Sequence, residues 1–216
     1  LAGRMRGKVL RRADFIIAVS AFCKGEIVSR YQVRPEKIAI VSNGVDIDRF
    51  RPKACSRELE RSLGLNGKTV VLSMGRLIER KGFDVLISAF PAVLAEFQQS
   101  VLVIVGDGPE RERLRWLAEQ EGVRDNVVFI DTVADDVVPD IYQLADVFAM
   151  PNRTLPDGDT EGFGLVFLEA SASGKAVVGG MGGGSIEGVI DGETGLTVDG
   201  HRKDAVAEAL IRLLKN

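Results

Sequence analysis

The feature that most constrains the fold is an alternation along the chain, in which short runs of apolar, mostly β-branched residues are separated by longer stretches with helical periodicity. The short runs are apolar at nearly every position, which is typical of strands that are buried on both faces. Such strands, joined by helical stretches, predict an α/β fold with a Rossmann-like parallel sheet flanked by helices. We expect strands at 15–19, 38–42, 69–74, 101–105, 127–130, 147–150, 176–178 and 196–198, and helices near 21–31, 56–63, 83–97, 109–121, 136–145, 164–173 and 203–215.

One break divides this alternation. An Asn-Gly turn signal at Asn43 and a proline at Pro52 bracket a stretch without regular periodicity. We therefore expect a linker at 43–54, a main domain at 55–216 and a first piece at 1–42 that is the remnant of another domain. Because the chain starts with leucine rather than methionine, we expect it to be cut from a longer protein.

Composition argues against several classes of protein. With 28 basic and 31 acidic residues the net charge is −3, whereas nucleic-acid binding depends on clustered positive charge. The longest apolar runs, such as 101–105, are far shorter than the roughly 20 residues of a transmembrane helix. The single histidine, His201, follows a glycine in a turn, so we expect it on the surface and outside any multi-histidine metal site.

Two observations bear on the location of the protein. Cys23 and Cys55 form no CxxC pair, and two thiols in a chain of 216 residues are typical of a reduced, cytoplasmic protein. Residues 1–12 carry five basic side chains and no acidic one. A solvated helix end accounts for this charge, and a helix edge that faces phosphates or a membrane surface is the alternative.

Ligands of open α/β sheets bind beyond the carboxyl ends of the strands, so the turns after the expected strands are the candidate sites. The turn after the strand at 69–74 begins with Gly75 and carries Arg76 and Lys81 ahead of a helical stretch. A guanidinium and an ammonium group placed in this way can bind one diphosphate. A basic turn that is only exposed to solvent is the alternative.

A second candidate turn combines glycines with two carboxylates. Gly162 and Gly164 allow backbone N–H groups at a helix N-terminus to approach a phosphate, where the helix dipole also favours an anion. Glu169 lies about two helical turns beyond Gly162 on the same helix face, so Glu161 and Glu169 flank one anion-binding loop. Carboxylates that accept from hydroxyl groups, beside cations that hold phosphates, suit a nucleotide-sugar. The alternative for Glu169 is an ordinary surface position.

Three other turns are open to structural interpretations. Residues 106–111 give a partial dinucleotide fingerprint in which Arg111 takes the place of a small residue, and a tight strand-to-helix turn is favoured. Residues 179–185 contain five glycines ahead of Ser185, a candidate helix N-cap, and this loop is either flexible or passes under the sugar or phosphates of a ligand. Residues 157–159 have the Asp-x-Asp spacing of a divalent-metal site, but the surrounding turn formers favour an acidic turn.

Taken together, the motifs resemble the retaining GT-B glycosyltransferases of family 4, and specifically their C-terminal, donor-binding domain. The resemblance covers residues 13–200 and depends on the order of the motifs rather than on any one of them. It implies that the chain is the C-terminal half of a GT-B fold. The residues that carry it are 13–20, 43–46 with Phe50 and Pro52, 75–77 with Lys81 and Gly82, 105–109, Tyr142 with 145–148, Glu161, Glu169, and Glu187 with 192–196.

The resemblance also implies roles for the candidate residues. Arg76, Lys81 and Glu161 are implied to be catalytic: the two cations grip the donor diphosphate and stabilise the departing nucleoside diphosphate, and Glu161 lies near the hydroxyls and the reacting face of the donor sugar. Glu169 is implied to hold the nucleotide ribose. The family's reaction retains the anomeric configuration by front-face attack, in which the leaving phosphate helps to deprotonate the acceptor, and it uses no metal or other cofactor. The further donor-binding residues are Gly75, Gly162, Phe163, Gly164 and Leu165.

The sequence departs from the family pattern in three places. Asp131 stands where many members have glycine, and Ile186 stands where proline usually precedes Glu187. The N-terminal domain, which binds the acceptor and often carries an active-site histidine, is missing except for residues 1–42, so a glycan or lipid acceptor would bind through that missing domain. Residues 148–154 look most like the mannosyltransferase branch, including enzymes that act on phosphatidylinositol mannosides, which favours GDP-mannose as the donor.

We therefore predict the donor-binding part of an enzyme that transfers a hexose from a nucleoside-diphosphate sugar to a glycan or glycolipid, and that has little or no activity as an isolated chain. Its expected location is cytoplasmic, with peripheral association at the inner membrane face as an open alternative, and its expected context is cell-envelope or polysaccharide biosynthesis. One rival is an NAD-binding Rossmann oxidoreductase that uses the turn at Gly106, with Asp131 as the ribose acid. The other rival is a non-catalytic nucleotide-sugar-binding module.

Overall fold

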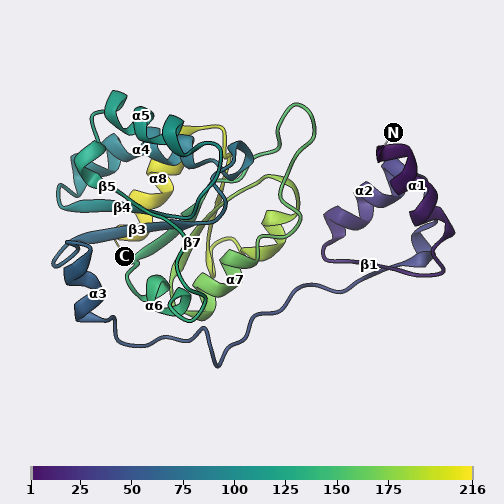
Figure 1. The fold of residues 1–216 in the computed structure, drawn as a ribbon, viewed down its shortest axis with the longest axis horizontal. Coiled ribbons are helices and arrows are strands. Elements are labelled where there is room, and N and C mark those ends of the chain that lie inside the picture. Colours follow the sequence, from purple (N-terminus) through teal and green to yellow (C-terminus); the bar gives the residue numbers. More distant parts are fainter. Residues whose placement is uncertain (1, 216) are drawn as a thin grey trace.

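The computed structural model describes residues 2–215, with side chains for residues 7–215, and contains two parallel sheets (Figure 1). The smaller sheet lies in the N-terminal piece, drawn in purple. Residues 41–56 contain no helix or strand and connect this piece to the main body. The elements of the piece are α1 (Ala2–Arg12), β1 (Ile16–Ala18), α2 (Ala21–Tyr31), the 3-10 helix η1 (Pro35–Lys37) and β2 (Ile38–Ile40).

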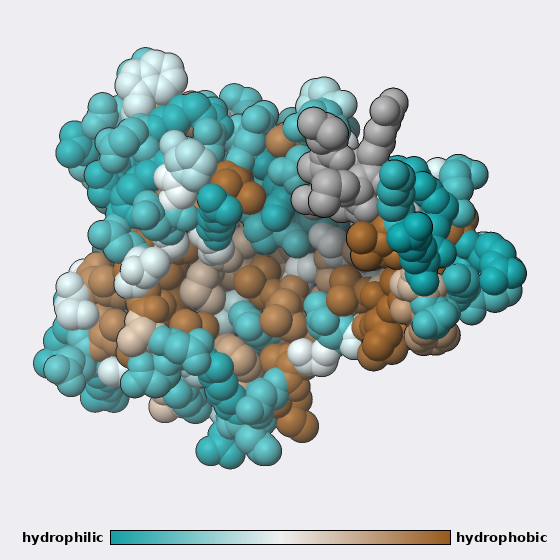
Figure 2. All heavy atoms as spheres, turned by 45° about the vertical axis from the view of Figure 1, so that its right-hand side comes forward, coloured by the Kyte–Doolittle hydropathy of each residue, from teal (hydrophilic) through white to brown (hydrophobic). Residues whose placement is uncertain are grey.

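The smaller sheet has one covered face and one uncovered face. Ile16, Ala18 and Ile38 are buried and pack against apolar residues of α1 and α2. Ile17 alternates with Ile16 and Ala18, is 64% exposed and pairs with Ala39 on β2, so these two residues share the opposite face. In Figure 2 the piece lies at the right, where brown apolar surface adjoins hydrophilic surface. An apolar sheet face that no described residue covers is typical of a surface that packs against further protein.

The larger sheet forms the main body and has six parallel strands in the order β5-β4-β3-β6-β7-β8. Its central strands are apolar and almost fully buried, as the pattern of apolar runs predicts. The expected Rossmann-like parallel sheet is therefore confirmed. The strands are β3 (Thr69–Met74), β4 (Ser100–Val105), β5 (Val127–Ile130), β6 (Val147–Met150), β7 (Ala176–Gly180) and β8 (Gly195–Val198).

Helices cover both faces of the larger sheet, with α4, α5 and α8 on one side and α6 and α7 on the other (Figure 1). The helix α4 shows why they pack there: Phe83, Leu86 and Phe90 are fully or almost fully buried and recur at helical spacing. Burial of such a side chain stabilises the fold by roughly 1.5–3 kcal/mol. The elements are α3 (Arg57–Ser62), η2 (Glu79–Lys81), α4 (Phe83–Glu96), α5 (Arg111–Gln120), η3 (Arg124–Asn126), α6 (Val138–Gln143), α7 (Leu165–Ala172), η4 (Gly183–Gly188) and α8 (Lys203–Leu214).

The strand order defines where a ligand can bind. The order runs outward in opposite directions from the adjacent strands β3 and β6, so the sheet changes its winding between them. In open α/β sheets the ligand crevice lies at such a switch point, beyond the carboxyl ends of the strands. The turns that follow β3 and β6, at 75–82 and 151–164, therefore meet at the expected position of the site.

The single histidine, the two cysteines and the starts of two helices were also predicted from the sequence. His201 is exposed, and Cys23 and Cys55 are free thiols. The helices expected near 109–121 and 136–145 are shorter than predicted and begin at Arg111 and Val138. Among the described residues, no helix is both long enough and apolar enough to span a membrane.

Candidate functional site

The turn after β3 carries an exposed arginine, Arg76, whose guanidinium has no hydrogen-bond or ion-pair partner among the described residues. The turn closes at Gly82, which has a φ of 75°; a Cβ there would lie 2.1 Å from the carbonyl oxygen of Pro151. This contact requires glycine, because a side chain would collide with backbone. The turn that carries Arg76 is thus packed directly on the turn after β6.

Lys81, in contrast, is already paired. Its Nζ lies 2.5 Å from Oε2 of Glu161, and the two side chains are only 12% and 15% exposed. The same carboxylate accepts a hydrogen bond from the Gly162 N–H at 3.2 Å and one from Nδ2 of Asn152 at 3.4 Å. The structure therefore brings together Lys81 and Glu161, which are 80 positions apart in the sequence. A partly buried ammonium–carboxylate pair can exchange its partners for the phosphate and hydroxyls of a ligand.

Arg80 completes the cluster around Glu161. Its guanidinium lies 3.8 Å from the Glu161 carboxylate and 3.3 Å from the carboxylate of Asp159. Asp159 also donates its N–H to the side chain of Asp157 at 2.9 Å, which closes the turn at 157–159. Residues 157–159 therefore form an acidic turn, as favoured, and one of its two carboxylates, that of Asp159, is paired with Arg80. No group of three or more His, Cys, Asp or Glu side chains within the described residues could hold a metal ion.

The start of α7 provides the backbone of the candidate loop. Gly164 has a φ of 86° at the N-cap, and a Cβ there would lie 2.7 Å from the ring of Phe167. Phe163 is 5% exposed, so this residue can contact a ligand only through its backbone, whereas Leu165 is 40% exposed. The N-terminus of α7 thus lies next to Glu161 with its positive dipole end toward the crevice, which favours a bound anion.

Glu169 lies on α7 and is held by a tyrosine. The hydroxyl of Tyr142, a fully buried residue, donates to Oε2 of Glu169 at 2.7 Å. Burial, followed by the charge of Glu169, raises the pKa of Tyr142, so this hydroxyl stays a donor. The rings of Phe50 and Phe148 pack against Tyr142 with centroids 5.8 and 5.6 Å away. The sequence indicated Glu169 but gave Tyr142 no role. A buried tyrosine needs a hydrogen-bond partner for its hydroxyl, and this requirement is the signal that could have linked Tyr142 to the site.

The turn after β4 supports the turn after β3. A Cβ on Gly106 would lie 2.1 Å from the carbonyl oxygen of Gly75, and one on Gly108 would lie 2.3 Å from that of Leu77. Arg111 donates to the Gly106 carbonyl at 3.0 Å and forms an ion pair with Asp131. The favoured interpretation as a tight turn is confirmed. The ion pair also occupies the carboxylate that a dinucleotide-binding enzyme would need for the ribose.

A buried ion pair between Arg153 and Asp84, next to the site, was not predicted from the sequence. Arg153, with a 7% exposed side chain, forms two hydrogen bonds to Asp84 at 2.8 and 2.9 Å, and its N–H donates to the carbonyl of Arg80. Burial opposes ionisation of Asp84, but the hydrogen bonds and charge of Arg153, assisted by Arg113, outweigh it and lower the pKa of Asp84. The signal is an arginine three residues after an apolar strand, which requires a partner if it is buried.

The glycine-rich segment at the end of β7 and directly after it packs against the backbone of the turn after β6. A Cβ on Gly180, Gly183 or Gly184 would lie 1.9–2.3 Å from the carbonyl oxygens of Asn152, Glu161 and Gly162 respectively. These glycines therefore allow backbone to lie on backbone, a role that neither expected alternative included. The expectation that Ser185 is a helix N-cap is wrong, because the N-cap of the helix here is Gly182. Ser185 is buried in the 3-10 helix η4 and its hydroxyl donates to the carbonyls of Gly180 and Gly182.

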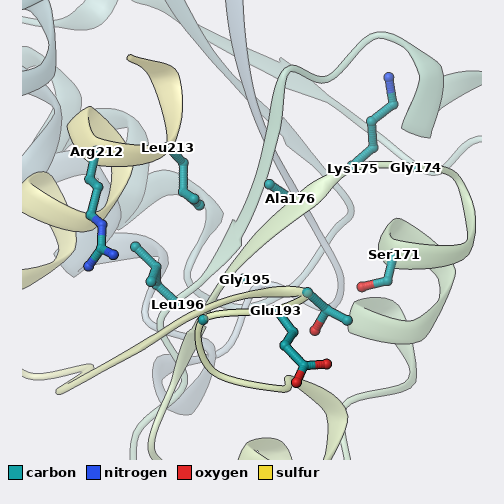
Figure 3. Close-up of a pocket in the computed structure, with 11 residues that line it drawn as sticks. Ser171, Gly174, Lys175, Ala176, Glu193, Gly195, Leu196, Arg212 and Leu213 are labelled. Atoms are coloured by element: carbon teal, nitrogen blue, oxygen red, sulfur yellow. The ribbon is translucent and has the colours of Figure 1, made fainter. Parts of the chain in front are cut away.

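A separate hollow lies at the opposite end of the sheet. Its volume is about 440 Å³, and it opens near the first residues of β7 and β8 (Figure 3). Lys175 and Glu193 line it, but in Figure 3 their charged ends point away from each other. Residues 192–196, which carry part of the family resemblance, line this hollow, but none of the predicted catalytic or donor-binding residues does. The converging charged groups at the carboxyl ends of β3 and β6 are therefore the better candidate site.

Comparisons with curated proteins relate this geometry to enzymes of known kind. A GDP-mannose-dependent alpha-(1-6)-phosphatidylinositol monomannoside mannosyltransferase of Mycobacterium tuberculosis is 43% identical over 212 residues, which are 95% of this chain and 55% of that protein. A D-inositol 3-phosphate glycosyltransferase of Streptomyces scabiei is 35% identical over 97% of this chain and 48% of its own length. The chain thus spans about half the length of these curated relatives.

Solved structures and family models agree with this. HepE of Anabaena, solved in complex with UDP and glucose, has a TM-score of 0.85 and 26% identity, over 99% of this chain and 57% of that one. The C-terminal domain of a group 1 glycosyl transferase from Francisella tularensis has a TM-score of 0.69 and 27% identity, over 80% of this chain and 89% of that one. Residues 1–49 match the model for glycosyltransferase family 4, and residues 56–216 match that for glycosyl transferases group 1. The chain therefore belongs to the glycosyl transferases of group 1.

Proposed function

We propose that this chain is the donor-binding part of a retaining hexosyltransferase that uses GDP-mannose and acts on a glycan or glycolipid. The observation that carries the proposal is the position of an unpaired Arg76, the Lys81–Glu161 pair and a tyrosine-held Glu169. They lie on the turns after β3 and β6, the strands at the switch point of the sheet, and on the helix α7 that follows the second turn. The names of the relatives support the donor, since several are GDP-mannose-dependent mannosyltransferases. The HepE complex with UDP and glucose supports a nucleotide-sugar at this fold.

The two cations have different tasks in this proposal. Arg76 is free to bind the donor diphosphate as it arrives, through parallel N–H groups. Lys81 donates to Glu161 in the free protein, and turns toward the β-phosphate when the diphosphate enters. Negative charge grows on that phosphate as its bond to the sugar breaks, so both cations bind the transition state more tightly than the ground state.

Glu161 and the start of α7 form the sugar side of the site. With Lys81 drawn to the phosphate, the Glu161 carboxylate accepts from sugar hydroxyls, and the N–H groups near Gly164 and Leu165 bind the sugar and phosphate. In the retaining reaction the bond from C1 to the phosphate oxygen breaks, and the acceptor oxygen bonds to C1 on the same face. The acceptor proton passes to the leaving phosphate. Glu169, oriented by Tyr142, accepts from the ribose hydroxyls of the nucleotide.

Residues 1–42 belong, in this proposal, to the domain that binds the acceptor. The uncovered sheet face with Ile17 and Ala39 supports this, because it offers an apolar surface on which further sheet or helix can pack. A lipid acceptor, as named for the mycobacterial relative, would place the protein in the cytoplasm at the inner face of the membrane. The basic residues Lys8, Arg11 and Arg12 at the end of α1 suit that surface.

Calorimetry with GDP, UDP, GDP-mannose and UDP-glucose tests the donor. We expect GDP-mannose to bind most tightly, and the double variant Arg76→Ala, Lys81→Ala to weaken binding by at least about 100-fold, since each cation makes a charge-assisted contact of roughly 1.5–3 kcal/mol. The control is Arg57→Ala, Lys68→Ala, which removes two exposed cations outside the crevice. If none of the nucleotides binds, or if the first double variant binds like its control, the phosphate clamp is wrong.

A further inference from the structure

The N-terminus of α2 contacts the donor loop although it lies about 140 residues away in the sequence. The hydroxyl of Ser20 donates to the carbonyl of Gly162 at 2.7 Å. The backbone N–H groups of Ala21 and Phe22 donate to the two oxygens of Glu187 at 2.9 and 3.0 Å. Helix α2 belongs to the N-terminal piece, whereas Gly162 and Glu187 belong to the main body. The contact therefore joins the two parts of the chain beside the proposed sugar site.

The fit between the two parts is close. Ser20 is fully buried, and its hydroxyl also accepts from the N–H of Cys23 at 3.0 Å, so it is both N-cap and bridge. A Cβ on Gly184 would lie 2.9 Å from that hydroxyl, and a Cβ on Gly162 would lie 3.4 Å from the sulfur of Cys23. Glycines of two loops thus leave the space that α2 occupies. The Glu187 carboxylate stabilises this arrangement further because it lies at the positive end of a helix dipole.

The contact holds the backbone next to Glu161. The N–H of Gly162 donates to the Glu161 carboxylate, and the carbonyl of Gly162 accepts from Ser20. Both polar groups of this one residue are therefore fixed, one by the proposed catalytic carboxylate and the other by α2. Loss of the α2 contact would leave the Gly162 carbonyl without this donor and would free the loop that leads into α7.

We propose that Ser20 and Glu187 are positioning residues, through which α2 fixes the Glu161–Gly162 segment for the donor sugar. The inference rests on the proposed function for the identity of the sugar site, but the docking of α2 can be tested apart from it. Neither residue touches the donor in this proposal. Their effect falls mainly on the sugar, which lies at Glu161 and Gly162, and less on the nucleotide, which is held chiefly by Arg76 and Glu169.

Two measurements on the whole chain test the proposal in a Cys55→Ser background, which leaves Cys23 as the only thiol. The first is the rate at which a neutral maleimide labels Cys23, whose sulfur lies 3.4 Å from the Gly162 carbonyl. The second is the pair of dissociation constants for GDP-mannose and GDP. The main variant is Glu187→Ala, because Glu187 is exposed and its loss leaves the core intact; the control is Glu193→Ala, which removes an exposed glutamate elsewhere. Ser20→Ala is a second variant.

We expect Glu187→Ala to label Cys23 several-fold faster than the control and to weaken GDP-mannose binding by about three- to tenfold, with a smaller change for GDP. Ser20→Ala should show the same split between the two nucleotides. Equal labelling rates in Glu187→Ala and its control would overturn the docking of α2. Faster labelling with the same change in both nucleotides would overturn the positioning role. If the unaltered chain binds no nucleotide, the proposed function fails, and the labelling rates still decide whether α2 docks.

Discussion

The turns after β3 and β4 are neighbours in space and similar in sequence, yet they differ in what their arginines do. Each begins with glycine directly after a buried strand and carries arginine within the next few residues. Arg76 in the first turn is exposed and unpaired within the described part of the chain. Arg111 in the second turn is bound to the Gly106 carbonyl and to Asp131. A similar local pattern thus produces a free cation in one turn and a structural brace in the other.

This difference shows that the ligand-binding capacity of a cation depends on whether the fold already satisfies it. Arg111 would lose an ion pair and a backbone hydrogen bond before it could bind a phosphate, whereas Arg76 would lose only water. The second turn contributes differently: its glycines at 106 and 108 fix the backbone of Gly75 and Leu77 from beneath. The first turn therefore offers the charge, and the second makes it rigid.

The largest effect is expected from Gly106→Ala, which removes the support. The new Cβ would lie 2.1 Å from the Gly75 carbonyl oxygen at a φ of 135°, so the backbone of both turns must shift. We expect a loss of about 3–5 kcal/mol in the free energy of unfolding, measured with urea, together with weaker GDP-mannose binding.

The control for this prediction is Gly122→Ala, at a φ of 69° with no atom within 4 Å of its Cβ. Only the conformational cost of about 1 kcal/mol applies there. Equal losses at Gly106 and Gly122 would show that the two turns are not in close contact in solution.

The next largest effect is expected from Asp84→Asn, which leaves Arg153 buried beside an uncharged partner. Removing one member of a buried pair costs about 3 kcal/mol or more. Because the pKa of Asp84 is lowered in the folded state, the pair stabilises the protein above the unfolded pKa of about 3.9 and loses that effect as the pH falls through the folded value.

Urea unfolding of the unaltered chain and of Asp84→Asn should therefore differ most at pH 7, and the difference should shrink as the solution is acidified. The measurement also sharpens the comparison, because Arg153 anchors the carbonyl of Arg80 in the first turn. A difference that stays constant with pH would mean that the charge of Asp84 does not contribute.

Arg76→Ala and Arg111→Ala should give opposite results, and this pair tests the comparison directly. Arg76→Ala should weaken GDP-mannose binding by roughly 10- to 100-fold, with a change in unfolding free energy below about 0.5 kcal/mol. Arg111→Ala should lower the unfolding free energy by about 1 kcal/mol while binding changes little. Calorimetry gives the dissociation constant for GDP-mannose, and urea unfolding gives the free energy of unfolding, for each of the two variants. Similar behaviour of the two variants would contradict the assignment of distinct roles.

The sequence predicted the parts of the molecule that local pattern determines. The buried strand at 69–74 was predicted with its bounds, because an apolar run between turn signals leaves few alternatives for a short segment. Glycine and charge at the strand ends indicated the candidate turns, because parallel strands place their carboxyl ends together. The Lys81–Glu161 and Asp84–Arg153 pairs were not predictable, since each joins residues about 70–80 positions apart. The contact of α2 with Gly162 spans still more chain and leaves no local signal.

The smallest effect is expected from Tyr142→Phe, which removes one hydroxyl from the ribose side of the site. Glu169 would lose its 2.7 Å hydrogen bond, and because the carboxylate is partly exposed, water can replace much of it. We expect a loss of about 1 kcal/mol in stability and a several-fold weaker binding of GDP, since a loosely held carboxylate must be ordered again on binding. Tyr31→Phe, at the only other tyrosine, is the control. Because Glu169 belongs to α7 and not to either glycine turn, an equal effect of Tyr142→Phe and Arg76→Ala on GDP binding would show that affinity is spread over the crevice instead of concentrated at the turn after β3.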